Sequence, residues 1–234
     1  MLAVMNAGRT VRERARAELT REIADAARRQ LADVGANGLS LRAVARELGM
    51  VSSALYRYFP SRDDLLTALI VEAYEAVADA AEAADRGGPP ADRWRAVCAA
   101  IRGWALAHPH EYALIYGSPV PGYQAPRTTV PPAARIPLAL VAIVRDAWTA
   151  GVLDAGDDPP PASPVLRAQL REVAEMAAPG LPDAVLARAL IAWTQLFGMI
   201  SFELFGQLIG SVDPSEEFFA HTTERMARFI GLPA

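Results

Sequence analysis

Residues 40–65 (SLRAVARELGMVSSALYRYFPSRDDL) hold two short helical patterns on either side of a glycine turn. Ser40 precedes the first pattern, over Leu41–Leu48, which Gly49 stops; Ser52 starts the second, which ends before Pro60. Serine is a favoured N-cap, glycine a favoured C-terminal cap, and the residue before proline avoids the α region. The apolar spacing predicts one shared inner face, made of Leu41, Val44, Leu48, Leu55 and Phe59. In a helix-turn-helix of this kind, the second helix enters the major groove of DNA.

The other side of the second helix carries hydroxyl groups and an arginine. Such groups can contact phosphates and base edges, and arginine can bind guanine through two hydrogen bonds. A further helix begins at Ser61 and Arg62, and its free N-terminal amides suit a phosphate. We predict phosphate contacts for Tyr56, Tyr58 and Arg62, and base contacts for Ser52, Ser53 and Arg57. The full predicted DNA-binding set is Ser40, Arg42, Ser52, Ser53, Ala54, Tyr56, Arg57, Tyr58, Ser61 and Arg62. The competing interpretation is a plain corner between two helices with solvated tyrosines.

The rest of the 234 residues also favours helices, without strand-like alternation. A first helix should end at Gly35, another should run over 61–84, and others should cover 92–108, 111–116, 133–150, 164–178, 182–209 and 214–230. The fold class is therefore all-α, with about nine or ten helices. We expect a three-helix DNA-binding domain over 1–60, a connecting helix over 61–84, and a larger helical effector-binding and dimerisation domain over 85–234.

Charge is distributed unevenly along the chain, whose formal net charge is −4. Residues 1–70 carry 11 arginines against 8 acidic residues, whereas residues 71–234 carry 12 against 19. A basic first third on an acidic body suggests that only the N-terminal part meets an anion such as DNA.

Motifs for catalysis, metal binding and secretion are weak or missing. The sequence holds no glycine-rich phosphate loop, serine elbow or paired carboxylates, so we predict neither an enzyme nor a cofactor. His108 and His110 are separated by a proline, which breaks the helical spacing of a zinc site, and Cys98 is the one cysteine, so we predict no metal. The start, MLAVMNAGRT, lacks the apolar core of a signal peptide, which predicts a cytoplasmic protein.

An apolar stretch, ALIAWTQLFGMISF, occupies residues 189–202. It is shorter than the roughly 20 apolar residues of a membrane span, and a helix apolar on all sides must be covered on all sides. One neighbouring helix cannot cover it, so we predict a subunit interface formed by Leu190, Ile191, Thr194, Gly198, Ser201, Phe202, Phe218, Phe219 and Met226.

Aromatic residues are numerous in the same C-terminal body. They are typical of a core, but their number also permits a cavity for a small apolar or aromatic ligand. The predicted lining residues are Trp104, Tyr112, Tyr116, Trp148 and Phe197. Three arginines, Arg95, Arg102 and Arg145, could each reach a ligand carboxylate or could lie in solvent.

Residues 16–80 resemble the DNA-binding domain of the tetracycline-repressor (TetR) family of bacterial regulators. The resemblance rests on the turn Gly49-Met50-Val51, on Leu55-Tyr56-Arg57-Tyr58-Phe59, and on Pro60-Ser61-Arg62 with Leu65. The family usually has His where Tyr58 stands and Lys where Arg62 stands. The resemblance implies a homodimer, a two-fold operator and an effector pocket in the C-terminal helices.

The C-terminal body is similar to a C-terminal domain of this family with a Trp-His-Gly signature. The matching stretches are Trp104 to Pro109, Tyr112 to Gly117, and Trp193 to Gly198. Phe197 stands at the histidine position, so any chemistry of that histidine in relatives is not expected here.

These observations predict a ligand-responsive transcriptional regulator, more a repressor than an activator, that binds a palindromic DNA operator as a homodimer. Two alternatives stay open: a DNA-binding dimer without a small-molecule effector, and an enzyme on a helical scaffold. A small molecule that weakens operator binding would exclude the first, and absence of turnover would exclude the second.

Overall fold

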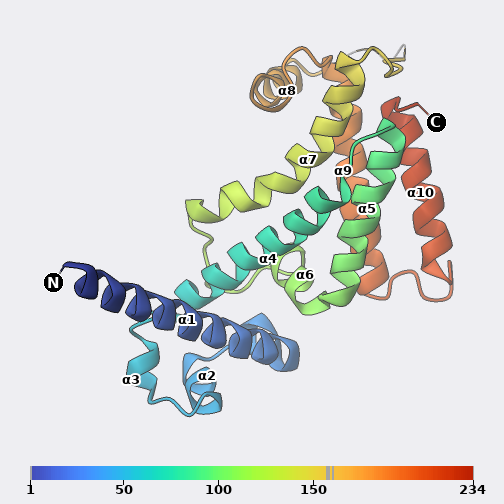
Figure 1. The fold of residues 1–234 in the computed structure, drawn as a ribbon. Coiled ribbons are helices and arrows are strands. Elements are labelled where there is room, and N and C mark those ends of the chain that lie inside the picture. Colours follow the sequence, from blue (N-terminus) through green and yellow to red (C-terminus); the bar gives the residue numbers. More distant parts are fainter. Residues whose placement is uncertain (1, 157–158, 160, 234) are drawn as a thin grey trace. The chain divides into compact units, whose positions relative to one another are not determined.

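The computed structural model describes residues 2–156, 159 and 161–233, with side chains from residue 12 onward. Within these residues the fold is all-α, as the sequence predicts, and no strand is formed (Figure 1). The helices are α1 (Leu2–Gly38), α2 (Leu41–Glu47), α3 (Ser52–Leu55), α4 (Arg62–Ala84), α5 (Pro90–Ala107), α6 (Pro109–Tyr116), α7 (Val130–Thr149), α8 (Pro164–Ala177), α9 (Asp183–Leu204) and α10 (Ser215–Ile230), with a 3₁₀ turn at Arg127–Thr129.

The chain divides into two compact units whose limits differ from the predicted domain limits. The first unit comprises the chain up to Ala73 together with His110–Thr129, and the second comprises Tyr74–Pro109 and the chain from Val130 onward. The division therefore falls within α4, because that helix is long enough to contribute one half to each unit. It also assigns most of α6 and the following loop to the N-terminal unit.

The core of the first unit is built from α1, α2, α3 and the start of α4. The predicted inner face is confirmed, since four of its five residues are buried and the fifth, Leu48, packs partly buried against the same cluster. From α6 and its loop, Leu114, Val120 and Tyr123 pack against this cluster. Those contacts explain why residues 110–129 belong to the N-terminal unit although they follow α5 in sequence.

Two glycines end helices of this unit in the left-handed conformation. Gly35 has φ 68° and interrupts α1, and Gly49 has φ 64° and follows α2, as the sequence predicts. A side chain at either φ would be strained, whereas glycine adopts it freely. Ser40 stands at the N-cap of α2 but makes no side-chain capping bond, and its backbone N–H instead donates to Oε1 of Gln30 at 3.0 Å.

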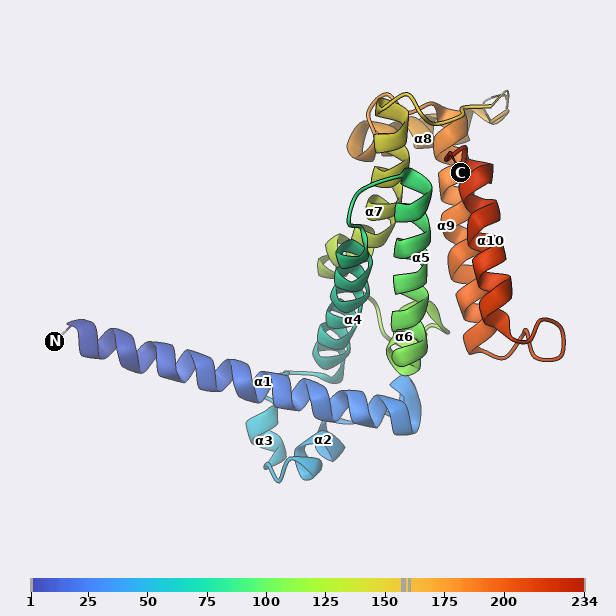
Figure 2. The ribbon, with the colours of Figure 1, turned by 45° about the vertical axis from the view of Figure 1, so that its right-hand side comes forward.

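In the second unit, α5, α9 and α10 lie side by side, and α7 packs against α5 and α9 (Figures 1 and 2). Its largest fully buried side chains include Trp94, Ile101, Ile143 and Leu186. Arg102 and Glu203 form an ion pair between α5 and α9, with Nη2 to Oε1 at 2.6 Å and both side chains largely buried. Arg135 of α7 likewise bonds Asp79 and Glu82 on the C-terminal half of α4.

One helix, α9, is long and apolar enough by composition to cross a membrane, among the residues that the structure describes. In its most apolar window 44% is buried within the chain. The core helix of a globular protein meets the same criterion, so this feature is weak evidence for a membrane span.

Candidate nucleic-acid interface

The predicted recognition residues gather on α3 and the turn that follows it. The α-helix covers only Ser52–Leu55, rather than reaching Phe59, and Val51 instead of Ser52 is its N-cap. The chain continues as a tight turn, in which the N–H groups of Tyr58 and Phe59 both donate to the carbonyl oxygen of Leu55 at 2.8 and 3.1 Å. This short element keeps Leu55 and Phe59 in the core and exposes Tyr56 and Arg57, whereas Tyr58 is half-buried and packs against the same core cluster.

The outward side is exposed enough to meet DNA. Ser53 and Arg57 are exposed, Tyr56 is 42% exposed, and Ser52 and Ala54 are half-buried. Arg42 on α2 is also exposed. Hydroxyl, guanidinium and methyl groups at such positions match what major-groove recognition requires. The structure thus brings most of the predicted set onto adjacent elements of one unit.

Arg62, a predicted phosphate contact, is engaged within the chain. Its Nη2 donates to the carbonyl oxygen of Ala36 at 2.7 Å, and its Nε donates to that of Leu39 at 3.2 Å. Carbonyl groups at the end of a helix lack intrahelical partners, and a cation there is favoured by the helix dipole. Arg62 therefore ties the start of α4 to the end of α1, which sequence spacing alone could not show.

Ser61 is also used within the chain. Its hydroxyl accepts from the backbone N–H of Asp64 at 3.1 Å and donates to Oδ2 of Asp64 at 2.6 Å. These bonds cap the N-terminus of α4, whose start at Ser61 and Arg62 the sequence predicts. With Asp63 and Asp64 in the first turn, the start of α4 is less suited to a DNA phosphate than predicted.

The sequence analysis missed a contribution of α1 to this interface. The guanidinium carbon of Arg16 lies 5.3 Å from the ring centroid of Tyr58, and its Nη2 donates to the carbonyl oxygen of Arg57 at 3.3 Å. Some 40 residues separate the partners, and no periodicity within α1 signals such a contact. A pocket of about 240 Å³ at this point is lined by Arg16, Leu19, Met50, Ala54, Arg57 and Tyr58.

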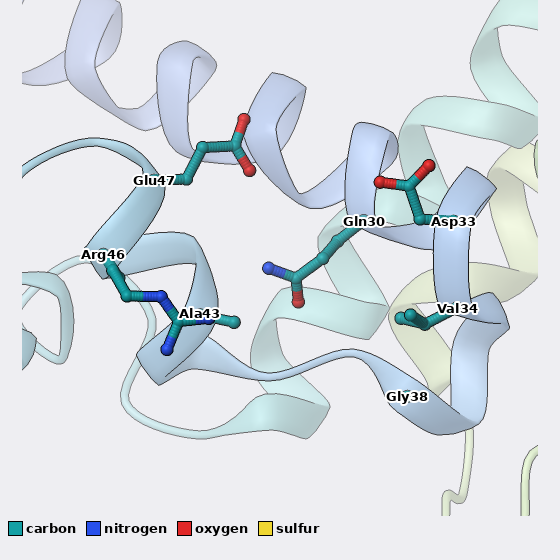
Figure 3. Close-up of a pocket in the computed structure, with 7 residues that line it drawn as sticks. All are labelled: Gln30, Asp33, Val34, Gly38, Ala43, Arg46 and Glu47. Atoms are coloured by element: carbon teal, nitrogen blue, oxygen red, sulfur yellow. The ribbon is translucent and has the colours of Figure 1, made fainter.

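A second pocket of the same unit has a different character. It has a volume of about 320 Å³ and lies between the C-terminal part of α1 and α2 (Figure 3). Both signs of charge surround it, since Asp33 and Glu47 accompany Arg46 among its lining residues. Glu47 moreover pairs with Arg29 at 2.7 Å. A pocket with two carboxylates does not favour a phosphate.

The predicted ligand-lining residues fall in both compact units. Tyr112 and Tyr116 belong to the first, where their ring centroids lie 5.1 Å apart and Tyr112 is fully buried. In the second, Trp104 stacks on His108 at 5.2 Å, Phe197 meets the ring of Trp193 edge-on at 6.4 Å, and Trp148 is half-buried.

The three arginines considered for a ligand carboxylate are paired with carboxylates of the chain itself. Arg95 pairs with Asp92 and Glu224, Arg102 with Glu203, and Arg145 with Asp146. The hydrogen bond from Arg102 holds the pKa of Glu203 below its ordinary value, and the Ser215 hydroxyl acts in the same direction. An anionic ligand would have to displace these partners.

The predicted dimer residues divide into exposed and buried groups. Along α9, Ile191 and Phe202 are each 55% exposed, and Thr194 and Gly198 on the same face are exposed as well. Leu190, Ser201 and Phe218 are half-buried. Phe219 and Met226 are only 5% exposed in the single chain, so they offer little surface to a partner.

Metal-ligating side chains do not cluster among the described residues, where no group of three or more His, Cys, Asp or Glu could hold an ion. Nδ1 of His108 lies 3.0 Å from the carbonyl oxygen of Trp104. Cys98 is fully buried, and burial raises the pKa of its thiol, so the thiol stays protonated and unreactive.

Two family models match the chain. Residues 23–69 match the bacterial regulatory proteins of the tetR family, and residues 94–226 match the tetracyclin repressor-like C-terminal domain. The chain is 43% identical over 223 residues to HTH-type transcriptional regulators of Mycobacterium tuberculosis and Mycobacterium bovis, covering 90% of this chain and 92% of each relative.

Solved structures agree with these matches. A regulatory protein, SCO4313, is 37% identical, with a TM-score of 0.75 and coverage of 92% of this chain and 97% of its own. A protein of unknown function from Rhodococcus sp. RHA1 is 27% identical, with a TM-score of 0.70 and coverage of 91% and 95%. Where a role is given, these relatives are regulators. The chain belongs to the TetR family of DNA-binding transcriptional regulators.

Proposed function

We propose that this regulator is a repressor that binds a two-fold symmetric operator as a homodimer and is released by a small apolar or aromatic effector. The observation that carries the DNA-binding part is the exposed surface of α3 and its following turn. Serine, tyrosine and arginine side chains stand there on a buried framework, while the surrounding unit is the basic part of the chain. Ser52, Ser53 and Arg57 are the proposed base contacts, and Tyr56 is a proposed phosphate contact.

The homodimer is supported by the uncovered face of α9. Ile191, Thr194, Gly198 and Phe202 recur at helical spacing and are exposed in the single chain. Exposed large apolar side chains in a row mark an interaction surface. A partner that presents the same face would cover them, and two-fold symmetry of the dimer would then be mirrored in the operator.

The effector part rests on the aromatic content of the helical body and on its charge pairing. Because Arg95, Arg102 and Arg145 are already paired, an uncharged effector fits better than an anionic one. Trp104, Trp148 and Phe197, which belong to the second unit, remain the proposed contacts, whereas Tyr112 and Tyr116 belong to the first unit. DNA binding also supports a cytoplasmic location.

A switch needs a ligand that binds the DNA-binding state and the released state of the protein with different affinity. A ligand with equal affinity for both states does not shift the equilibrium between them. Two helices can carry the signal, since the boundary between the compact units falls within α4 and at the start of α6. Loss of a factor of 10–100 in operator affinity requires roughly 1.4–2.8 kcal/mol of coupling, which is usual for allostery.

The test is footprinting on the DNA upstream of the protein's own gene, followed by operator competition with a library of apolar and aromatic compounds. We expect protection of an inverted repeat and at least one compound that raises the melting temperature and releases DNA. Protection of one asymmetric site would contradict the dimer. Compounds that stabilise the protein without releasing DNA would point to a DNA-binding dimer that lacks an effector switch.

A further inference from the structure

Arg16 connects α1 to the turn after α3. This turn ends the recognition segment, by which we mean residues 52–59. Its guanidinium covers the ring of Tyr58 and donates to the carbonyl oxygen of Arg57. Both views of the ribbon show α3 next to α1 (Figures 1 and 2). Arg16 is itself held within α1, where its carbonyl oxygen accepts from the hydroxyl of Thr20 at 2.8 Å. The contact therefore joins a short turn to a long helix.

The recognition segment needs such support because it is short. The α-helical part of α3 has four residues, and helices this short are marginal without tertiary contacts. Arg57 and Tyr58 lie beyond that part. Their conformation depends on the bonds from Arg57 to Ala54 and from Tyr58 and Phe59 to Leu55, on the packing of Tyr58 against the core, and on the contact with Arg16. An arginine over an aromatic ring is attracted by the ring quadrupole, and its N–H groups remain free to donate in the plane of the guanidinium.

Among the residues that the structure describes, those that line the pocket around the Arg16 guanidinium offer no carboxylate that would compete with the Tyr58 ring and the Arg57 carbonyl oxygen. None of the six residues that line the pocket at this point is acidic, and Leu19, Met50 and Ala54 form its apolar wall. The neighbouring pocket between α1 and α2 differs, since it contains Asp33 and Glu47 (Figure 3). An arginine that lies over a ring and donates one N–H within the chain is better placed to orient its partners than to follow a DNA phosphate.

We propose that Arg16 is a positioning residue for DNA recognition: it fixes the turn that carries Tyr56, Arg57 and Tyr58 in the orientation that reads the operator. This inference rests on the proposed operator binding. It assigns to Arg16 an effect on specific binding, whereas a phosphate contact would strengthen binding to any sequence and would add to its salt dependence.

The experiment compares full-length wild type with Arg16→Ala and Arg16→Lys. The control is Arg21→Ala, which removes the same charge from an exposed position of α1. Amide hydrogen exchange is measured without DNA, with attention to the N–H groups of Tyr58 and Phe59. Affinity is then measured for the operator and for a random duplex over a series of salt concentrations.

In Arg16→Ala we expect exchange at Tyr58 and Phe59 to accelerate about 3- to 10-fold while the rest of α1 is unchanged. Operator affinity should fall about 3- to 10-fold, with random-duplex affinity and the salt slope the same as in Arg21→Ala. Arg16→Lys keeps a cation that can lie over the ring and should recover most of the operator affinity.

Three results would overturn the inference. Equal losses on both duplexes, with a salt slope lowered by about one more than in Arg21→Ala, would make Arg16 a phosphate contact. Unchanged exchange at Tyr58 and Phe59 would show that the contact does not hold the turn. Accelerated hydrogen exchange throughout the first unit in both Arg16→Ala and Arg16→Lys would show that Arg16 contributes only to the stability of that unit. If wild type prefers no duplex while exchange at the turn still responds to Arg16→Ala, the operator proposal fails and the structural coupling stands.

Discussion

Nη2 of Arg62 lies 2.7 Å from the carbonyl oxygen of Ala36, which joins the first residue of α4 to the last turn of α1. The same guanidinium donates to the carbonyl oxygen of Leu39 at 3.2 Å and to that of Asn37 at 3.5 Å, so one side chain serves three backbone acceptors. The planar fork of arginine permits these contacts, which a single ammonium group makes less well. Arg62 thereby fixes the start of α4 to the segment that links α1 and α2.

Arg62→Ala should destabilise the first unit by about 1–3 kcal/mol, because charge-assisted hydrogen bonds to three carbonyl groups are lost. All four tryptophans lie in the second unit, so tryptophan fluorescence does not report on this change. Hydrogen exchange of the α1 and α2 amides is the suitable measurement. Arg86→Ala, at an exposed position outside the helices, is the control. A lowered salt slope of DNA binding with unchanged exchange would restore Arg62 as a phosphate contact.

Arg57→Ala should act on specificity, since the side chain is exposed while only its backbone carbonyl is engaged by Arg16. If Arg57 binds a base, the cost is about 1–3 kcal/mol for the operator, and base preference relaxes at one position of each half-site. Binding assays on a set of operators with single base changes measure both effects. Equal losses on operator and random DNA would place Arg57 on the phosphate backbone.

Gly198→Arg should yield monomers without disturbing the fold of the subunit. A Cβ atom at Gly198 meets nothing within 4 Å in the single chain, so the cost arises only if a second subunit lies on this face. An obligate interface would bury more than about 2,000 Å². Gly103→Arg is the matched control, because Gly103 is an exposed helical glycine on α5 that is equally unobstructed. Light scattering that shows an unaltered dimer for Gly198→Arg would contradict the proposed interface.

Glu203→Gln should lower the stability of the second unit in a pH-dependent manner. Arg102 holds the pKa of the Glu203 carboxyl below its ordinary value of 4.5, so the ion pair stabilises the folded state fully above that pH. The stabilisation is lost as the pH falls through the lowered pKa. We expect the substitution to lower the free energy of unfolding by about 1–3 kcal/mol at neutral pH, and this difference should shrink toward pH 3. Urea unfolding followed by tryptophan fluorescence measures it.

Glu175→Gln, at an exposed position on α8, is the control for that series and should show no such trend. A Glu203→Gln difference that stays constant between about pH 6 and pH 3 would show that the pair does not contribute through its charge.

Tyr123→Phe should weaken the attachment of the loop after α6 to α4 within the first unit. The hydroxyl groups of Tyr123 and Thr67 lie 2.9 Å apart. Removal of the Tyr123 hydroxyl breaks this hydrogen bond and should lower the free energy of unfolding by about 0.5–1.5 kcal/mol. Operator affinity without effector should change little, while the effector concentration needed for release should shift, because α6 is one of two routes for the signal. Effector titrations of DNA release measure this. An unchanged titration curve would leave α4 as the sole route.

The sequence alone determined the features that depend on neighbours within a turn or two. Gly35 and Gly49 end helices because only glycine adopts their positive φ without strain, and Ser61 caps α4 through a residue three positions on. The apolar spacing over 41–59 fixed the inner face of the helix-turn-helix for the same local reason. Recognition of the family motif in that segment then supplied the expected function.

Only the tertiary structure decided which side chains meet across long stretches of sequence. Arg62 and Ser61 bear the right chemistry for a phosphate, yet the chain places backbone and carboxylate partners in front of them. Phe219 and Met226 belong to an apolar stripe, and such a stripe does not tell whether its own subunit or a partner covers it. Arg16 and Tyr58 meet because α1 packs next to α3, and helix packing depends on the whole core, which no local pattern encodes.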